Sequence, residues 1–114
     1  MSKGGIALGA RGERLAAAWY EKQGYAVVAR NWRCDIGEID LIARRAGMVV
    51  IAEVKTRSSE RFGAPAQAVG FAKQRKLRAL AAAWLASSGD YFDEVRFDVV
   101  SIIGNAVEVI PAAF

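Results

Sequence analysis

The hydrophobic and polar positions of this chain follow two alternating spacings, which predict helices and strands in turn. From Leu8 to Gln23 apolar residues recur at helical spacing, and Gly24 follows where a helix C-terminal cap belongs. The next stretch, "YAVVARN" from Tyr25 to Asn31, is rich in β-branched and aromatic residues and leads into a polar loop. The N-terminal part therefore predicts a helix followed by a strand.

The middle of the chain predicts an antiparallel hairpin. Two apolar stretches, at about residues 38–44 and 48–55, are joined by "RAG", which places Gly47 at a turn position. Because side chains alternate faces along a strand, four residues of the second stretch share one face: Val49, Ile51, Glu53 and Lys55. Two charged side chains therefore point the same way.

The hairpin register predicts that charged side chains from both strands gather in one patch. Antiparallel pairing places Asp40 opposite Ala52 or Glu53, and places Glu38 about two residues further, toward Lys55. Two carboxylates about 4 Å apart repel by roughly 4 kcal/mol at an effective dielectric of about 20, so the patch favours a bound cation. Oxygen ligands favour a hard ion, Mg²⁺ or Mn²⁺, which bridges phosphate oxygens. The pattern indicates phosphodiester chemistry.

The C-terminal half predicts a second helix and a second hairpin. After a polar loop from Thr56 to Gly63, Pro65 suits the first turn of a helix, whose apolar stripe ends near Gly89. The stretches "VRFDVVSII" and "AVEVI" then read as strands around Gly104-Asn105. In the first of them, Asp98 is predicted to be an ion-pair partner near the second helix.

Composition narrows the class of protein. With 114 residues, 54% of them hydrophobic and 25% charged, residues 1–114 have the size and composition of one globular domain. No apolar run approaches the roughly 18 residues that span a bilayer, and the start lacks the apolar stretch of a signal peptide. We therefore expect a cytoplasmic protein without a membrane partner. Histidine is absent, which excludes Ser-His-Asp and Cys-His catalysis and histidine-ligated zinc. The single Cys34 cannot form an internal disulfide.

The basic residues suggest a polyanionic partner. Lys and Arg number 16 against 12 Asp and Glu, which gives a net charge of +4. Two arginines, Arg57 and Arg61, follow the strand of Lys55. Four more basic residues lie beside the apolar stripe of the second helix: Lys73, Arg75, Lys76 and Arg78. These six side chains are candidates for nucleic-acid binding, although a solvated helix face would show the same pattern.

Several motifs together resemble a known family. Asp40 followed by Glu53-Val54-Lys55 resembles the PD-(D/E)xK nuclease signature of the restriction-endonuclease-like superfamily. Ile39 stands where a proline often stands in that signature. The chain from about Gly9 to Ile103 is similar to the small YraN-like (UPF0102) bacterial proteins. The similarity lies in "GARGERLAAAWYEKQGY", "NWRCDIGEIDLI", "EVKTR", "AVGFAKQRKLRALAAAWL" and "RFDVV".

The resemblance implies an α/β, restriction-endonuclease-like fold, in which helices flank a central mixed sheet. It implies Asp40 and Glu53 as ligands of Mg²⁺ or Mn²⁺, and Lys55 as the group that orients or activates the attacking water. It also implies a carboxylate from Glu13, as in Holliday-junction resolvase relatives. The substrate would be nucleic acid, more readily DNA than RNA. A homodimer would suit the cutting of both strands of a duplex or a junction.

Other interpretations of the same residues stay open. Glu53 and Lys55 could form an ion pair on a solvated sheet face. Glu38 could be an outer partner of Lys55 or Arg57, and Glu13 an ordinary carboxylate in the first turn of a helix. The competing functions are a catalytically inactive nucleic-acid-binding module of the same fold and a structural partner in an assembly. The presence of all three signature residues favours the enzyme.

Overall fold

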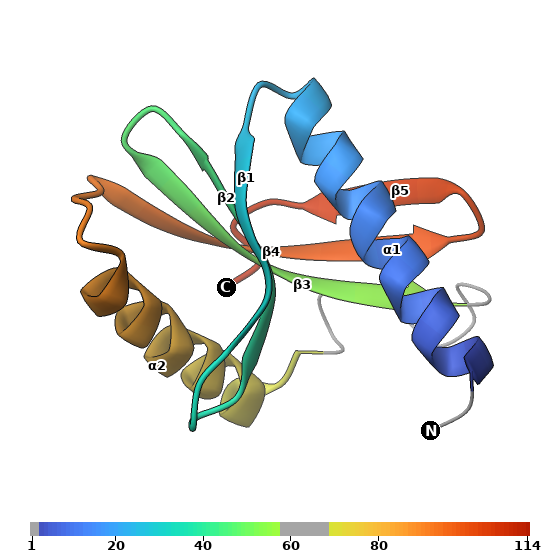
Figure 1. The fold of residues 1–114 in the computed structure, drawn as a ribbon, viewed down its shortest axis with the longest axis horizontal. Helices are drawn as coiled ribbons and strands as arrows, with labels where there is room; N and C mark the ends of the chain where they lie inside the picture. Colours follow the sequence, from blue (N-terminus) through green and yellow to red (C-terminus); the bar gives the residue numbers. More distant parts are fainter. Residues whose placement is uncertain (1–2, 58–68) are drawn as a thin grey trace.

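The described part of the chain folds into a five-stranded mixed sheet with one helix on each face. The computed structural model describes the backbone of residues 3–57 and 69–114. Its elements are α1 (Lys3–Lys22), β1 (Ala26–Arg33), β2 (Glu38–Arg45), β3 (Met48–Arg57), α2 (Phe71–Ser88), β4 (Glu94–Ile103) and β5 (Ala106–Ile110). The strand order is β1-β2-β3-β4-β5, and β3 and β4 are parallel while the other neighbours are antiparallel. This architecture, shown in Figure 1, confirms the expected α/β class and agrees with a restriction-endonuclease-like fold.

Two hydrophobic clusters fill the space between the sheet and the helices. On one face, Ala16, Ala17 and Tyr20 of α1 pack on β2, β3 and β4 through residues that include Leu41 and Val50. On the other face, α2 packs through Leu77, Leu80, Ala81 and Trp84. Val49 and Ile51 face α2 whereas Val50 and Ala52 face α1, so the predicted alternation along β3 is confirmed. Neither helix, over its described residues, is long and apolar enough to cross a membrane.

The order of helices and strands matches the sequence prediction, and the main differences lie at helix starts. The first helix begins earlier, at Lys3. The second begins at Phe71 after Gly70, which is extended with φ −77° and ψ 175°. The expected start at Pro65 lies outside the described residues. The helix ends at Gly89, whose φ of 74° is a left-handed conformation typical of glycine at this position.

Asp98 lies under α1, and its predicted position near the second helix is wrong. Because Phe97 and Val99 on either side of it face α2, strand alternation turns Asp98 toward the opposite face. There its fully buried carboxylate accepts hydrogen bonds from the Tyr20 hydroxyl at 2.6 Å and from the Arg96 guanidinium at 2.8 Å. Burial and the Asp98 charge raise the pKa of Tyr20, so its hydroxyl stays a donor. This bond fastens α1 to β4.

The sheet divides into a fork beyond Leu41. The pairing of β2 with β3 runs from Arg45 with Met48 to Leu41 with Ala52, where it ends. β2 then continues with β1, while β3 continues with β4, so the β1–β2 hairpin leaves the plane of β3 (Figure 1). Across this point Leu41 packs toward α1 but Ile39 packs toward α2. Asp40 therefore lies where β2 changes face.

Gly12 lets α1 approach the fork closely. A Cβ atom at this position would lie only 2.3 Å from the Thr56 hydroxyl oxygen on β3, well inside van der Waals contact. The helix backbone therefore rests against the Thr56 side chain, and the next residue along α1, Glu13, is held beside the fork.

Gly12→Ala tests this close approach. Alanine in a helix normally stabilises by roughly 1 kcal/mol relative to glycine, but here we expect a loss of about 1–3 kcal/mol, since the new methyl group overlaps the Thr56 side chain. In a Thr56→Ala background the same substitution should become neutral or stabilising. Urea unfolding of the two single variants and the double variant gives the coupling. An equal effect of Gly12→Ala in both backgrounds would contradict the close approach.

Candidate functional site

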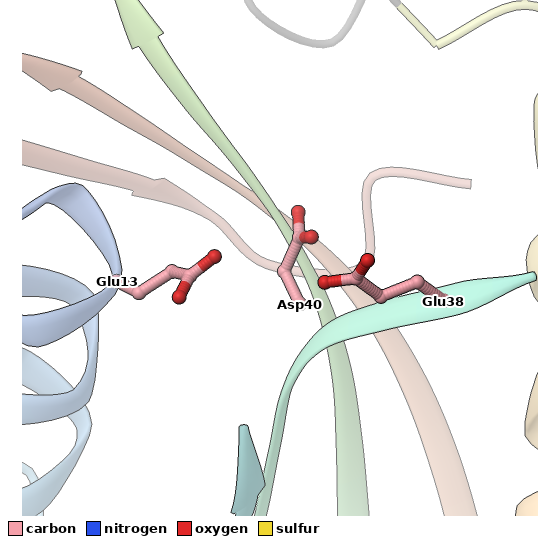
Figure 2. Close-up of side chains that lie close together, drawn as sticks. All are labelled: Glu13, Glu38 and Asp40. Carbon is pink, nitrogen blue, oxygen red and sulfur yellow. The ribbon is translucent and has the colours of Figure 1, made fainter. Parts of the chain in front are cut away.

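Three carboxylates from two elements converge at the fork. Glu13 comes from α1, and Glu38 and Asp40 come from β2; one oxygen from each lies within 4.8 Å of the others. Figure 2 shows Asp40 between the other two, with Glu13 reaching in from the helix. All three are partly buried, and they form the one such group among the described residues. Carboxylates far apart in sequence thus share one small volume.

The two glutamates of this group are held by neighbours on β1. The Asn31 side-chain amide donates a hydrogen bond to Glu13 Oε2 at 2.7 Å. The Arg33 Nε donates to Glu38 Oε2 at 3.2 Å, as a salt bridge that is partly exposed. Both partners lie on the strand that leaves the fork together with β2. The β1 strand of the hairpin therefore provides the side chains that position both glutamates.

Asp40 is the most perturbed member of the group. Its Oδ2 accepts a hydrogen bond from the Val54 backbone N–H at 2.8 Å, across the point where the strands separate. Burial, followed by the negative charge of Glu53 and smaller contributions from Glu13 and Glu38, raises the pKa of Asp40 to about 6 against the opposing effect of this hydrogen bond. The charged form of the Asp40 carboxylate is therefore disfavoured unless a cation is bound nearby.

Glu53 lies beside the cluster and is bound by two lysines. Only 6% of it is exposed, and its Oε1 lies 3.6 Å from Lys55 Nζ and 3.5 Å from Lys73 Nζ. The ion pair with Lys55 considered from sequence is therefore present, but on a buried face and not a solvated one. Lys73 belongs to α2, so two ammonium groups from different elements converge on this carboxylate.

The structure modifies the expected ligand set. Asp40 and Glu53 do lie on neighbouring strands, close enough for the charge of one to act on the pKa of the other. The tight group, however, contains Glu13 and Glu38 with Asp40, and Glu53 stands next to it. Glu38 joins the group because β2 leaves β3 at the fork. Continued pairing would have carried it toward Lys55.

The four basic residues of α2 point in different directions. Lys73 turns inward to Glu53, and Lys76 lies against the β1–β2 turn. The Arg78 guanidinium stacks 4.7 Å from the centre of an aromatic ring of β4, while Arg75 is exposed. Of the two arginines after Lys55, Arg57 ends β3 and Arg61 lies outside the described residues. The basic residues surround α2 and do not form one face.

The donor set fits a hard divalent cation. Every candidate ligand atom in the group is a carboxylate oxygen, the type that Mg²⁺ and Mn²⁺ prefer. Three negative charges within this spacing repel one another unless a cation or a proton intervenes. Burial is the largest cause of the raised pKa of Asp40, followed by the charge of Glu53 and then by smaller contributions from Glu13 and Glu38. Glu13, Glu38 and Asp40 could hold such an ion, with Glu53 beside them.

Comparisons with known proteins identify close relatives. The model of the family described as "Uncharacterised protein family UPF0102" matches residues 12–102, which include every acidic residue of the candidate site. A UPF0102 protein of Rhodococcus jostii is 51% identical over 98 residues, 86% of this chain and 83% of the relative. UPF0102 proteins of Nocardia farcinica and Beutenbergia cavernae are 52% and 53% identical over 97 residues, 85% of this chain and 76% and 82% of the relatives.

Asp40→Asn should stabilise the metal-free protein at alkaline pH. A pKa of about 6 in the folded chain lies above the unfolded value of roughly 3.9, so ionisation opposes folding, and the penalty builds up as pH rises from about 4 to 6 and is fully present above it. Asparagine removes the charge and can still accept the Val54 hydrogen bond. We expect a gain of about 1–2 kcal/mol at pH 8 with chelator and little gain near pH 4. Urea unfolding at both pH values measures it.

Glu108→Gln is the control, because Glu108 is an exposed carboxylate on β5. It should change stability little at either pH. An Asp40→Asn gain of the same size at both pH values, or a loss at pH 8, would show that Asp40 is not destabilised by its charge.

Proposed function

The chain belongs to the UPF0102 family, and we propose that it is a metal-dependent endonuclease that hydrolyses phosphodiester bonds in nucleic acid. The observation that carries this proposal is the convergence of Glu13, Glu38 and Asp40 at the fork, next to Glu53 and Lys55. An oxygen-only ligand group beside lysines is suited to a phosphate that must be both neutralised and attacked.

In this proposal the carboxylate group holds Mg²⁺ or Mn²⁺. When bound, such an ion lowers the pKa of a water molecule and stabilises the negative charge that develops at the scissile phosphate. The protein keeps the ligands in place: Val54 N–H orients Asp40, while Asn31 and Arg33 orient Glu13 and Glu38. These contacts favour one orientation of each carboxylate before substrate arrives. The contact from Arg33 is the weakest of the three, because its side chain is 75% exposed.

Lys55 and Lys73 supply positive charge on the other side of Glu53. Their side chains are 33% and 42% exposed, so both can contact a phosphate that approaches the site. Lys55, on the same strand as Glu53, donates hydrogen bonds that orient the attacking water or a non-bridging phosphate oxygen. Lys73 adds a second contact from α2. The ammonium groups thereby offset the repulsion between phosphate and carboxylates.

DNA is the first substrate to test, and branched DNA deserves inclusion because the resemblance to Holliday-junction resolvase relatives suggests it. The net charge of +4 and the four basic residues of α2, which has no acidic residue, support a polyanionic substrate. Cleavage of both strands of a duplex or a junction would suit a homodimer.

One observation supports a second candidate, a catalytically inactive module that binds nucleic acid. Glu53 already has two ammonium partners, so this carboxylate needs no metal to be stable. In such a module the acidic cluster would have no catalytic role, and the lysines would be the groups that bind phosphate. The two candidates differ in whether Asp40 is required for turnover.

Cleavage and binding by two variants separate these candidates. Purified protein is incubated with duplex, single-stranded, flapped and four-way-junction DNA and with the corresponding RNA, with Mg²⁺, with Mn²⁺ and with chelator. Asp40→Asn should lower the cleavage rate at least about 100-fold, since loss even of an outer partner of a metal ligand costs 10–100-fold. Lys55→Ala should also abolish turnover.

Metal-free binding should change in opposite directions. Asp40→Asn removes a charge that repels phosphate, so affinity in chelator should stay equal or rise, whereas Lys55→Ala removes an attractive charge and should lower it. Glu108→Gln and Lys22→Ala, at exposed positions away from the fork, serve as matched charge controls. Undiminished cleavage by both site variants would contradict the nuclease proposal. Binding shifts without any cleavage by the wild type would favour the binding module.

A further inference from the structure

Glu53 lies next to the acidic group at the fork but does not belong to it. After burial, its charge is the largest cause of the raised pKa of Asp40, so the two carboxylates are close neighbours. What distinguishes Glu53 from the three ligand candidates is its pairing with two ammonium groups, those of Lys55 and Lys73. Any role of Glu53 as a metal ligand therefore depends on these two contacts.

The two ion pairs of Glu53 are loose. Lys55 Nζ lies 3.6 Å and Lys73 Nζ 3.5 Å from Glu53 Oε1, whereas a charge-assisted hydrogen bond is usually about 2.7–2.9 Å long. Asp40, by contrast, accepts its backbone hydrogen bond at 2.8 Å. Each ammonium group ends a flexible four-carbon side chain, so it can move to another anion. The lysines therefore balance the charge of Glu53 without locking its position.

The lysines are much more exposed than the carboxylate that they share. The Glu53 side chain is 8% exposed, against 33% for Lys55 and 42% for Lys73. A phosphate that arrives from solvent can therefore reach the ammonium groups while Glu53 stays covered. Such a phosphate competes with Glu53 for the same two cations, because both anions gain by contact with an ammonium group.

We propose that a nucleic-acid phosphate draws Lys55 and Lys73 away from Glu53, so that this carboxylate becomes an additional metal ligand only when nucleic acid is bound. This inference rests on the proposed function. A buried carboxylate that loses its cationic partners is strongly destabilised, and a divalent cation in the neighbouring acidic group replaces their charge. Metal and nucleic acid then bind with positive cooperativity, and each raises the affinity for the other by the same factor.

The same contacts weaken metal binding to the protein without nucleic acid. Lys55 and Lys73 occupy one carboxylate, and their positive charges repel a cation that approaches the fork. A bound phosphate reverses both effects, since it neutralises the ammonium groups and releases Glu53. The complete set of acidic ligands therefore forms around a bound phosphate, where hydrolysis needs it.

A Mn²⁺ titration of the protein without nucleic acid tests whether Glu53 is withheld. Isothermal titration calorimetry gives the affinity of the wild type, Glu13→Gln and Glu53→Gln. Glu13→Gln should weaken Mn²⁺ binding about 10- to 100-fold, since it alters a ligand candidate. Glu53→Gln should weaken it less than about 3-fold, because this carboxylate is occupied by the lysines and acts only through its screened charge.

Replacement of the lysines should have the opposite effect on metal affinity. The double variant Lys55→Gln/Lys73→Gln frees Glu53 without nucleic acid, so Mn²⁺ should bind about 5- to 150-fold more tightly than to the wild type. Because loss of positive charge alone also favours a cation, the same pair of substitutions is made in a Glu53→Gln background, where the gain should fall below about 3-fold. Lys22→Gln, at an exposed position of α1, controls for net charge.

Fluorescence anisotropy of a labelled four-way junction and a labelled duplex measures the cooperativity itself. Ca²⁺ takes oxygen ligands as Mg²⁺ does, and a gel of the same samples checks that the DNA stays intact. Ca²⁺ should tighten DNA binding by the wild type about 5- to 150-fold relative to chelator at equal ionic strength. Glu53→Gln should lose most of this factor, yet bind DNA in chelator at least as tightly as the wild type, because its lysines are already free.

The outcomes separate this inference from the proposed function. Equal weakening of Mn²⁺ binding by Glu53→Gln and Glu13→Gln without nucleic acid would show that Glu53 is a ligand from the start, which contradicts the inference. A lysine effect that is undiminished in the Glu53→Gln background would contradict it as well. If the wild type cleaves DNA but Ca²⁺ and DNA bind independently, the coupling is wrong and the nuclease stands. If the coupling depends on Glu53 but no substrate is cleaved, the coupling stands and the nuclease is wrong.

Discussion

The candidate site depends on one hydrogen bond, from the Val54 backbone N–H to the Asp40 carboxylate. Two strands can separate inside a sheet only if the backbone donors that they release find other acceptors, because an unpaired buried N–H is costly. Asp40 supplies that acceptor at the point where β2 leaves β3. The same bond that lets the sheet divide also fixes the direction of a carboxylate into the space between the strands. Asp40 therefore serves both the division of the sheet and the candidate metal site. The raised pKa of Asp40 reflects the free-energy cost of placing a charge at this point of the sheet.

The first helix completes the site because two contacts fix its position on the sheet. At one contact Gly12 rests against Thr56, and eight residues later Tyr20 donates a hydrogen bond to the buried Asp98. Glu13 and Tyr20 are two helical turns apart and so lie on the same side of α1. A helix held at two points along this side cannot easily rotate or slide. Glu13 consequently reaches the carboxylates of β2 from a rigid element, although 25 residues separate it from Glu38 in the chain.

Because side chains alternate between the two faces of a strand, the hairpin, its register and the two faces of β3 could be predicted from sequence. They also brought Asp40 close to Glu53. What the alternation could not predict is the end of pairing at Leu41, since a regular register continues β2 alongside β3 and carries Glu38 toward Lys55. The divergence depends on tertiary packing, because Ile39 joins the cluster under α2 while Leu41 faces α1. The start of α2 at Phe71 was equally hidden, since Pro65 suggested an earlier start.

The two acidic parts of the site differ in how their charge is balanced, and this difference bears on function. Glu53 is paired with lysines from β3 and α2, whereas burial, the charge of Glu53 and smaller contributions from Glu13 and Glu38 raise the pKa of Asp40. A module that only binds phosphate has a use for the lysines but gains nothing from the acidic group beside them, because that group repels the ligand. A cation in the acidic group would remove this repulsion and place positive charge on both sides of an incoming phosphate. The acidic group and the lysines side by side are therefore what the proposed hydrolysis needs, whereas phosphate binding alone needs only the lysines.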